Sequence, residues 1–352
     1  MTAELAADDG EAGPALQYLH RVPGVDLDDD FADPSAGMVL HRVLAGSART
    51  FLLNDMGNEL VDEAKRSQTV GALNVLMQSR PVWARSAASE LDGTQRAVTQ
   101  TERIHQSRVS MRRIRSNLRT FRLLLDPAWG TSLRAELAWY GNCLGRARDL
   151  HILQDLVALK GAGIIDPGAV SQLEAVIADR MAEALASIDA ERGGARRFQL
   201  TEQMMVLWDG PAFKAKATKP AAEVLPRMLH RAWHDVRGAA RTAKKEPSAS
   251  NLHMLRIRMK DLRYGCNTVA LVEGGPARKT ARAAERLQVK LGDLHDAVFS
   301  IDWLRALATE RPDLARPIQA LVLVQEDAAA AAHKGWKRDL KDIERRWRRW
   351  QG

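Results

Sequence analysis

The sequence predicts an all-α protein built from two similar halves. A phrase that places a histidine ahead of basic residues at helical spacing occurs twice, in residues 104–125 and, 148 residues further on, in residues 252–272. A second phrase also occurs twice in the same order, in residues 144–153 and 291–301. Alanine, leucine and arginine abound, and no stretch alternates apolar and polar residues at the period of a strand.

The first half is expected to contain four helices and then a short one that joins the halves. A capping-box pattern, Thr99-x-x-Glu102, precedes the helix of the first phrase. Aspartate–proline pairs, which end one helix and open the next, divide the remainder. In chain order the helical stretches are 37–58, the first phrase, the second phrase, 167–191 and the short joining helix 193–210. Breaks at Asp126-Pro127 and Asp166-Pro167 separate the two phrases and precede 167–191.

The second half repeats this order. Its stretches are 221–244, the first phrase capped by Ser248 or Ser250, a break at 273–276, the second phrase, and 317–350. Residues 60–92 have no counterpart and are interpreted as an inserted helical pair broken at Pro81. The predicted organisation is a leader at 1–35, a first half at 36–210 and a second half at 211–352, the halves being four-helix units related by a pseudo-twofold axis.

Basic residues form one continuous stripe on the helix of each first phrase, and apolar residues take another sector. On a helix the first stripe falls within an arc of about 100°. Like charges three and four residues apart destabilise an isolated helix, so the same arrangement repeated in register indicates an anionic ligand. The stripes consist of His105, Arg108, Arg112, Arg115, Arg119 and Arg122, and of His253, Arg256, Lys260 and Arg263.

Charge is unevenly distributed along the chain. Residues 1–34 contain nine acidic residues and one arginine, and since the whole chain has a net charge of +8, the remainder carries +16. A basic body is typical of polyanion binders. The acidic leader is interpreted either as a disordered solubilising tail or as a competitor for the basic surface.

The two cysteines, Cys143 and Cys266, lie in helical patterns and indicate no disulfide framework. The N-terminus has no basic-then-apolar signal, and no apolar run approaches the roughly 20 residues of a membrane span. We therefore expect a cytoplasmic protein with no transmembrane segment.

The phrases HQSRVSMRRIR and LGRARDL, followed by HMLRIRMKDLRY and LGDLHD, resemble the two repeats of the CHAD family, the conserved histidine α-helical domain. The similarity spans roughly residues 37–350. It implies two four-helix halves around a basic central channel, binding of inorganic polyphosphate, association with polyphosphate granules, and no catalysis. The expected binding residues are His105, Arg108, Arg112, Arg115, Arg119, Arg148, His253, Arg256, Lys260 and Arg263.

Several positions depart from the first repeat. Asp261 stands where the first repeat has Arg113, and Asp293-Leu294-His295 replaces Arg146-Ala147-Arg148, which makes the second half the weaker cation. His151 occupies a position where the family usually has an acid.

Two other functions remain open from the residues alone. A basic groove also suits RNA, although the stripe lacks interleaved aromatic residues, so nucleic acid is not the expected partner. The pair His295-Asp296, with His253 and Asp302, resembles the ligands of a metal-dependent phosphohydrolase, but Arg148 at the equivalent place in the first repeat cannot ligate a metal. Asp149 and Asp296 are expected instead to hold basic side chains or helix ends by hydrogen bonds. No Walker loop, GxSxG elbow, paired-cysteine motif or HExxH occurs, and no cofactor is expected.

Two glycines and the C-terminal stretch are further features of the sequence. Gly145 and Gly292 are expected to permit close helix packing. The C-terminal stretch places Trp336, Trp347 and Trp350 on one side among lysines and arginines. It is predicted to be the last bundle helix, with docking on an anionic granule or lipid surface as the alternative.

Overall fold

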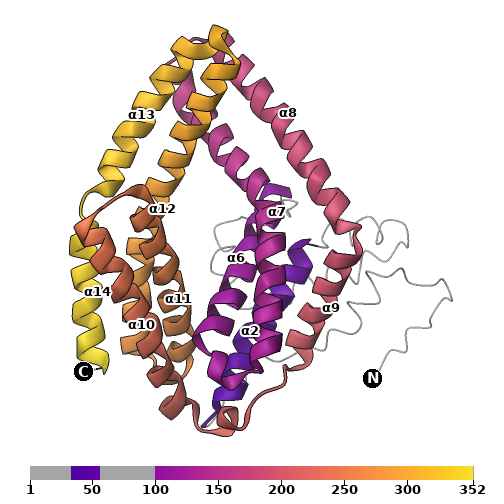
Figure 1. Ribbon diagram of the computed structural model, residues 1–352, viewed down its shortest axis with the longest axis vertical. Helices are drawn as coiled ribbons and strands as arrows, with labels where there is room; N and C mark the ends of the chain where they lie inside the picture. Colours follow the sequence, from indigo (N-terminus) through magenta and orange to yellow (C-terminus); the bar gives the residue numbers. More distant parts are fainter. Residues whose placement is uncertain (1–32, 56–99, 352) are drawn as a thin grey trace, which may run out of the picture.

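The computed structural model describes residues 33–55 and 100–351, and within them the protein is all α, as predicted (Figure 1). The acidic leader, the inserted segment at 60–92 and the capping box at Thr99 lie outside the described residues. The long helices are α2 (Ala36–Asp55), α6 (Gln100–Thr120), α7 (Pro127–Lys160), α8 (Pro167–Arg192), α9 (Ala195–Asp209), α10 (Ala221–Lys245), α11 (Ala249–Glu273), α12 (Gly275–Glu310), α13 (Ala315–His333) and α14 (Trp336–Gln351).

Side-chain caps mark three helix starts where the sequence predicted them. The carboxylate of Asp126 accepts a hydrogen bond from the backbone N–H of Trp129 (2.8 Å) at the start of α7. Asp166 caps α8 in the same way, through Ala169 (2.9 Å). Of the two candidate serines, Ser248 is the cap of α11. Each cap satisfies a backbone donor that has no partner within its own helix.

Two boundaries differ from the prediction. Helix α6 ends at Thr120, and a 3₁₀ turn, η1 (Arg122–Leu124), follows it, so Arg122 does not continue the helical stripe. The C-terminal stretch is two helices rather than one, because Gly335 adopts a φ of +79° between α13 and α14. Glycine populates this left-handed region at no steric penalty.

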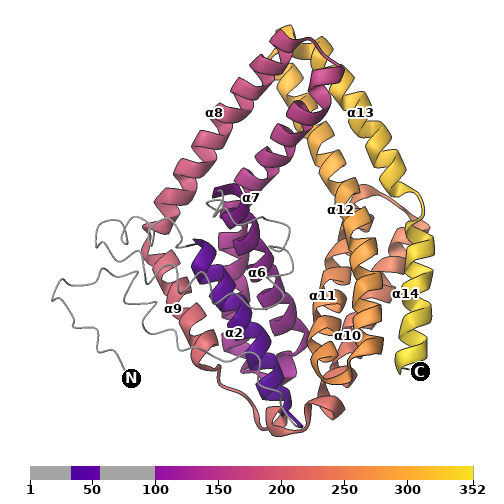
Figure 2. The ribbon, with the colours of Figure 1, turned by 180° about the vertical axis from the view of Figure 1, so that it is seen from behind.

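The helices form two groups that lie side by side (Figures 1 and 2). Helices α2, α6, α7 and α9 pack together in one group, and α10, α11, α12 and α14 in the other. The hairpins α7–α8 and α12–α13 extend beyond the groups and meet at their far ends, where Arg311 donates a hydrogen bond to Gln172 (3.1 Å). In the same region the Arg180 guanidinium contacts both the Glu310 carboxylate and the Trp303 ring.

The two groups are joined where α6 packs against α11. Asn117 accepts a hydrogen bond from the hydroxyl of Thr268 (2.7 Å), and both residues are fully buried. Ser116 donates to Asp261 (2.9 Å) across the same contact. A side chain at Gly265 would come within 3.2 Å of the Thr120 methyl group and 2.5 Å of a Leu229 methyl group. The close approach of these helices therefore depends on a glycine and is held by buried polar pairs.

Helix α14 is part of the bundle, as predicted. Trp336, Leu340, Ile343 and Trp347 are buried, and Trp347 stacks on Trp233 of α10 with ring centroids 5.1 Å apart. Its apolar side is therefore covered by its own protein. Across the described part of the chain, no helix is both long and apolar enough to cross a membrane.

Candidate anion-binding site

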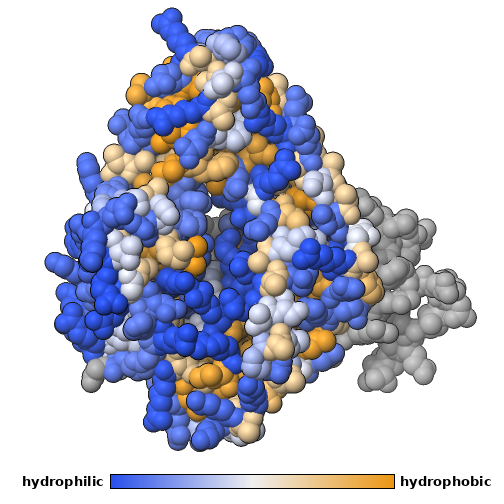
Figure 3. Space-filling model, in the orientation of Figure 1, coloured by the Kyte–Doolittle hydropathy of each residue, from blue (hydrophilic) through white to orange (hydrophobic). Residues whose placement is uncertain are grey.

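Five basic side chains converge where the two groups of helices face each other. They come from α6, α7 and α11, and all are half-buried. Each lies in the electrostatic field of others. For Arg108, burial is the main cause that lowers the pKa, and the charges of Arg112, Arg148 and Arg256 lower it further. Figure 3 shows this face hollowed in the middle and hydrophilic around the hollow. The central cluster, as we call it, consists of Arg108, Arg112, Arg148, Arg256 and Lys260.

A duplicated arrangement positions two guanidinium groups of the central cluster, those of Arg108 and Arg256. The guanidinium of Arg108 lies against Gly145 of α7, where an added Cβ would come within 2.8 Å of its Nη1 atom. The same nitrogen donates a hydrogen bond to the carbonyl of Gly141 (3.2 Å). Arg256 lies against Gly292 of α12 in the same way, at 3.4 Å from Nη2 to the added Cβ. The expectation that these glycines permit close helix packing is thus corrected: each one makes room for an arginine from the neighbouring helix.

The central cluster has no direct ionic partners. Within the described residues, none of its five members forms an ion pair, and the Nε atoms of Arg112 and Arg256 are buried without a hydrogen-bond partner. A buried donor without an acceptor is unfavourable by roughly 1–3 kcal/mol. An oxyanion would supply acceptors for these donors.

Carboxylates lie near the central cluster without contacting it. Burial raises the pKa of Asp149 and of Asp296, and the charge of Asp296 raises the pKa of Asp149 further across the two groups of helices. Asp293 adds a third carboxylate near Arg256. Among the described residues, neither Asp149 nor Asp296 makes a side-chain hydrogen bond, so the expectation that they hold side chains by hydrogen bonds is wrong. They act on the arginines through space.

The two predicted histidines lie at the edge of the central cluster. Burial lowers the pKa of His105, and the charges of Arg148 and Arg112 lower it further, while Glu102 opposes them. The pKa of His253 falls to about 4, through burial, then the charge of His295, then Arg256. The rings of His253 and His295 lie 4.3 Å apart, and His253 Nδ1 is buried without a partner. His295 was not among the predicted polyphosphate-binding residues, although it stands where the first repeat has Arg148 and the sequence grouped it with His253 in the metal alternative.

Lys260 is the most perturbed base of the central cluster. Its pKa falls from 10.5 to about 7, because the side chain is buried and the charges of Arg256, Arg112 and Arg108 surround it. The sequence predicted Lys260 as a binding residue, but its altered pKa follows only from the convergence of residues from two helices.

The remaining predicted residues lie elsewhere. Arg263 donates hydrogen bonds to Gln288 (3.2 Å) and Glu285 (2.5 Å) of α12. Its positive charge is therefore already paired with a carboxylate. Arg119 forms ion pairs with Asp235 (3.4 Å) and Asp261 (3.5 Å) at the end of α6. Arg115 lies between Arg119 and the central cluster, where burial lowers its pKa and the charge of Arg134 of α7 lowers it further.

The departures from the first repeat also have defined places. Asp261, which replaces a basic residue, faces α6 and joins the two groups of helices through Ser116 and Arg119. His151 pairs with Asp155 (3.6 Å) on its own helix. For the metal alternative, no group of three or more histidine, cysteine, aspartate or glutamate side chains within residues 33–55 and 100–351 could hold a metal ion.

The fold and the paired histidine-and-arginine helices define a helical protein with an internal basic site. The CHAD domain family model matches residues 84–305, and the chain belongs to this family.

Two curated proteins of Mycobacterium tuberculosis are similar to the chain: "Uncharacterized protein MT2285" (strain CDC 1551 / Oshkosh) and "Uncharacterized protein Rv2226" (strain ATCC 25618 / H37Rv). Each is 27% identical over 325 residues, which are 86% of this chain and 56% of the relative. The chain thus spans about half the length of the curated relatives that it matches.

Two solved structures have the same fold. The crystal structure of the CHAD domain from the plant Ricinus communis superposes with a TM-score of 0.62 at 18% identity, covering 91% of this chain and 95% of that one. PptA from Streptomyces chartreusis superposes with a TM-score of 0.60 at 19% identity, covering 88% of this chain and 99% of that one.

Proposed function

We propose that the protein binds inorganic polyphosphate in a basic channel between two four-helix halves, residues 36–210 and 211–352, related by a pseudo-twofold axis. The single observation that carries this proposal is the duplicated pairing of Arg108 with Gly145 and Arg256 with Gly292. It directs one guanidinium from each half toward the same space, and these groups have no ion-pair partner within the described residues.

Polyphosphate suits this site because it carries a charge on every unit. Several arginines can each bind non-bridging oxygens bidentately, and displacement of counterions from the chain favours binding. The stripe from His105 to Arg119 follows α6 for about 21 Å at a rise of 1.5 Å per residue, long enough to contact more than one phosphate. A single small anion would leave part of the stripe without acceptors.

RNA is the weaker candidate, since base stacking needs accessible aromatic rings. Helix α6 contains no phenylalanine, tyrosine or tryptophan. Tyr264, the one such residue of α11, is buried, and the guanidiniums of Arg113 and Arg263 lie over its ring at 5.8 and 5.3 Å from the centroid.

We further propose that the protein acts by binding alone, without chemistry on the ligand, and that binding to polyphosphate concentrates it on cytoplasmic polyphosphate granules. The convergence of five basic side chains supports retention of a polyanion, and among the described residues no group of three or more possible metal ligands offers a site for metal-assisted hydrolysis.

The test compares Arg108→Ala and Arg256→Ala with Arg237→Ala, a control that removes an exposed arginine from α10. We expect each cluster variant to bind long polyphosphate about 10- to 100-fold more weakly, the range for loss of a charge-assisted interaction, while the control matches the wild type. The melting temperatures should not fall, because no ion pair is lost. Equal affinities for all three variants, or preference of the wild type for RNA in competition at one salt concentration, would reject the proposal. Release of phosphate that depends on a divalent ion would establish the enzymatic alternative.

A further inference from the structure

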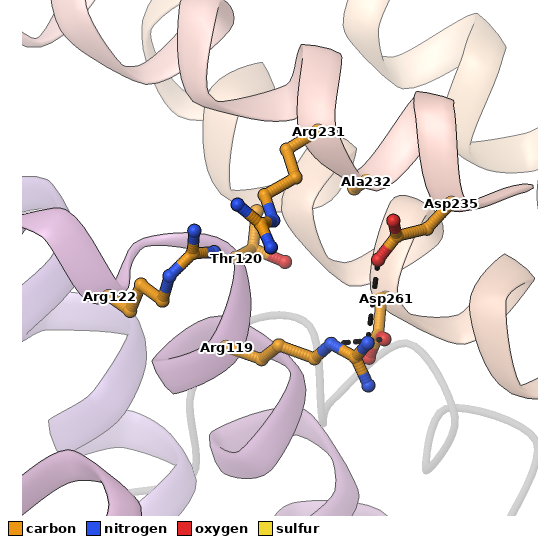
Figure 4. A pocket seen from close by; sticks show the side chains of 7 residues that line it. All are labelled: Arg119, Thr120, Arg122, Arg231, Ala232, Asp235 and Asp261. Atoms are coloured by element: carbon orange, nitrogen blue, oxygen red, sulfur yellow. Dashed lines mark hydrogen bonds and ion pairs between the residues drawn. The ribbon is translucent and has the colours of Figure 1, made fainter. Parts of the chain in front are cut away.

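A second group of arginines lies at the C-terminal end of α6, beyond the central cluster. Arg119 of α6, Arg122 of the η1 turn and Arg231 of α10 line one small open pocket. Figure 4 shows the three side chains reaching toward this pocket from separate elements. Arg134 of α7 lies near them. Burial lowers the pKa of Arg134, and the charges of Arg119 and Arg122 lower it further. We call Arg119, Arg122, Arg134 and Arg231 the outer cluster.

The outer cluster has more positive charge than the carboxylates beside it neutralise. Asp235 and Asp261 both pair with Arg119 (Figure 4). Arg122, Arg134 and Arg231 form no ion pair within the described residues. Two of these guanidiniums, Arg122 and Arg231, line the pocket itself and provide donors for a tetrahedral oxyanion.

The outer cluster has no equivalent in the second half. At the offsets that align the two halves, Arg119 corresponds to Asn267, Arg122 to Ala270, and Arg134 to Ala281. The counterpart of Arg115 is Arg263, which Glu285 neutralises. The cationic stripe that begins at the central cluster therefore continues along α6 to the outer cluster, whereas α11 has no such continuation.

Arg115 connects the two clusters along one face of α6. It lies three residues after Arg112 and four before Arg119, so successive guanidiniums are spaced about one helical turn apart. Its Nε atom is buried without a hydrogen-bond partner. A flexible polyanion that occupies the central cluster thus meets a further basic residue at each turn toward the outer cluster.

We infer that the outer cluster is a second oxyanion subsite, which takes phosphates of a polyphosphate chain as it leaves the central cluster along the first half. This inference rests on the proposed function. It predicts that a long chain is bound asymmetrically, with its contacts extending toward α10 and η1, and that short chains occupy the central cluster alone.

The test uses the full chain carrying Arg122→Ala with Arg231→Ala. The matched control is Arg237→Ala with Arg241→Ala, which removes the same charge from exposed positions of α10 outside the pocket lining. Affinities for triphosphate and for long polyphosphate are measured by calorimetry over a series of salt concentrations. We expect the pocket variant to bind long chains about 10- to 100-fold more weakly, with a salt slope shallower by about 1.4 if each contact contributes roughly 0.7, as in single-stranded nucleic acids. Its affinity for triphosphate should equal that of the control.

The possible outcomes separate this inference from the proposed function. If the wild type binds long chains and the pocket variant equals the control, the outer cluster is not a subsite while the proposed function stands. If triphosphate binding weakens as much as long-chain binding, the pocket is an independent phosphate site and the continuous path is wrong. If the wild type binds no polyphosphate, the proposed function itself fails.

Discussion

The guanidinium of Arg108 rests on Gly145 so closely that a Cβ at this glycine would lie 2.8 Å from Nη1. The contact joins two separate phrases of the sequence, because Arg108 belongs to the first phrase and Gly145 to the second. Arg256 and Gly292 repeat it in the other half. The two phrases therefore form one structural motif, in which a glycine on one helix makes room for an arginine from the neighbouring helix.

Gly145→Ala should weaken polyphosphate binding without destabilising the fold. The added methyl group displaces the flexible end of Arg108, whereas alanine is favoured over glycine within a helix by up to about 1 kcal/mol. We expect several-fold weaker binding in calorimetry and an unchanged or higher melting temperature. Gly130→Ala, on the same helix with no atom within 4 Å of its added Cβ, is the control. Unchanged binding by Gly145→Ala would show that the position of Arg108 does not matter.

Lys260 should make binding depend on pH near neutrality. Its pKa is about 7 in the free protein, and a bound polyanion raises it, so binding takes up a proton and becomes tighter as pH falls from about 8 to 6. Lys260→Met should flatten this dependence. Calorimetry in buffers of different ionisation enthalpy counts the protons, and equal uptake by wild type and variant would contradict the assignment.

Lys260 also affects the stability of the free protein. Its pKa in the folded state lies below its value of 10.5 when unfolded, so the unfolded state binds more protons between about pH 7 and 10.5. The positive charge of Lys260 therefore destabilises the folded protein fully below about pH 7. This destabilisation decreases as pH rises from about 7 to 10.5. Lys260→Met should raise the melting temperature at pH 7 by more than it does at pH 10, and thermal unfolding at the two pH values measures the difference.

His105 and His253 should govern a lower range of pH. Burial and neighbouring positive charge lower both pKa values, that of His253 to about 4, so a bound polyanion raises them toward the ordinary value of about 6.5. The double variant His105→Gln with His253→Gln should lose proton uptake below about pH 6.5 while it retains the step due to Lys260. If its profile matches the wild type at every pH, these histidines do not contact the ligand.

Asp296→Asn should tighten polyphosphate binding without lowering the stability of the free protein, because burial raises the pKa of this carboxyl and its charged form is disfavoured in the folded state. The Asp296 carboxylate attracts Arg256 and repels a polyanion through space, and asparagine removes the charge at nearly constant volume. We expect a several-fold gain in affinity at low salt that shrinks at high salt. Asp302→Asn, an exposed position of the same helix, is the control. Weaker binding by Asp296→Asn would mean that the carboxylate chiefly orients Arg256.

Asp55→Ala should destabilise the protein by about 3–5 kcal/mol, since it removes a fully buried carboxylate that forms an ion pair with the buried side chain of Arg197. The Asp55 carboxylate accepts hydrogen bonds from Arg197 (3.0 and 2.6 Å) and from the Tyr140 hydroxyl (2.7 Å). Tyr140→Phe removes one neutral donor and should be milder, about 1–2 kcal/mol. Denaturant unfolding checks both values. Equal effects would show that the ion pair adds nothing to the hydroxyl contact.

Local rules account for what could be predicted of the fold. Asp126 and Asp166, each followed by proline, placed helix starts correctly because capping and the missing proline N–H act within one turn. The early end of α6 at Thr120 could not be predicted in this way, because the residues after it are as basic and apolar as those before. There the chain leaves the helix where α6 meets α10 and α11.

For the candidate site, the sequence by itself determined which residues share a face of α6 or α11, because 3.6 residues per turn align His105, Arg108 and Arg112 without help from the rest of the chain. Only the tertiary structure decided which bases stay unpaired. Glu285 of α12 neutralises Arg263, whereas Arg112 and Arg256 meet no carboxylate at ion-pair distance among the described residues. It also decided the pKa of Lys260, since burial and the charges of α6 act on it across space. Helical period is a property of neighbouring residues, but the field at a charged atom is the sum over every helix packed around it.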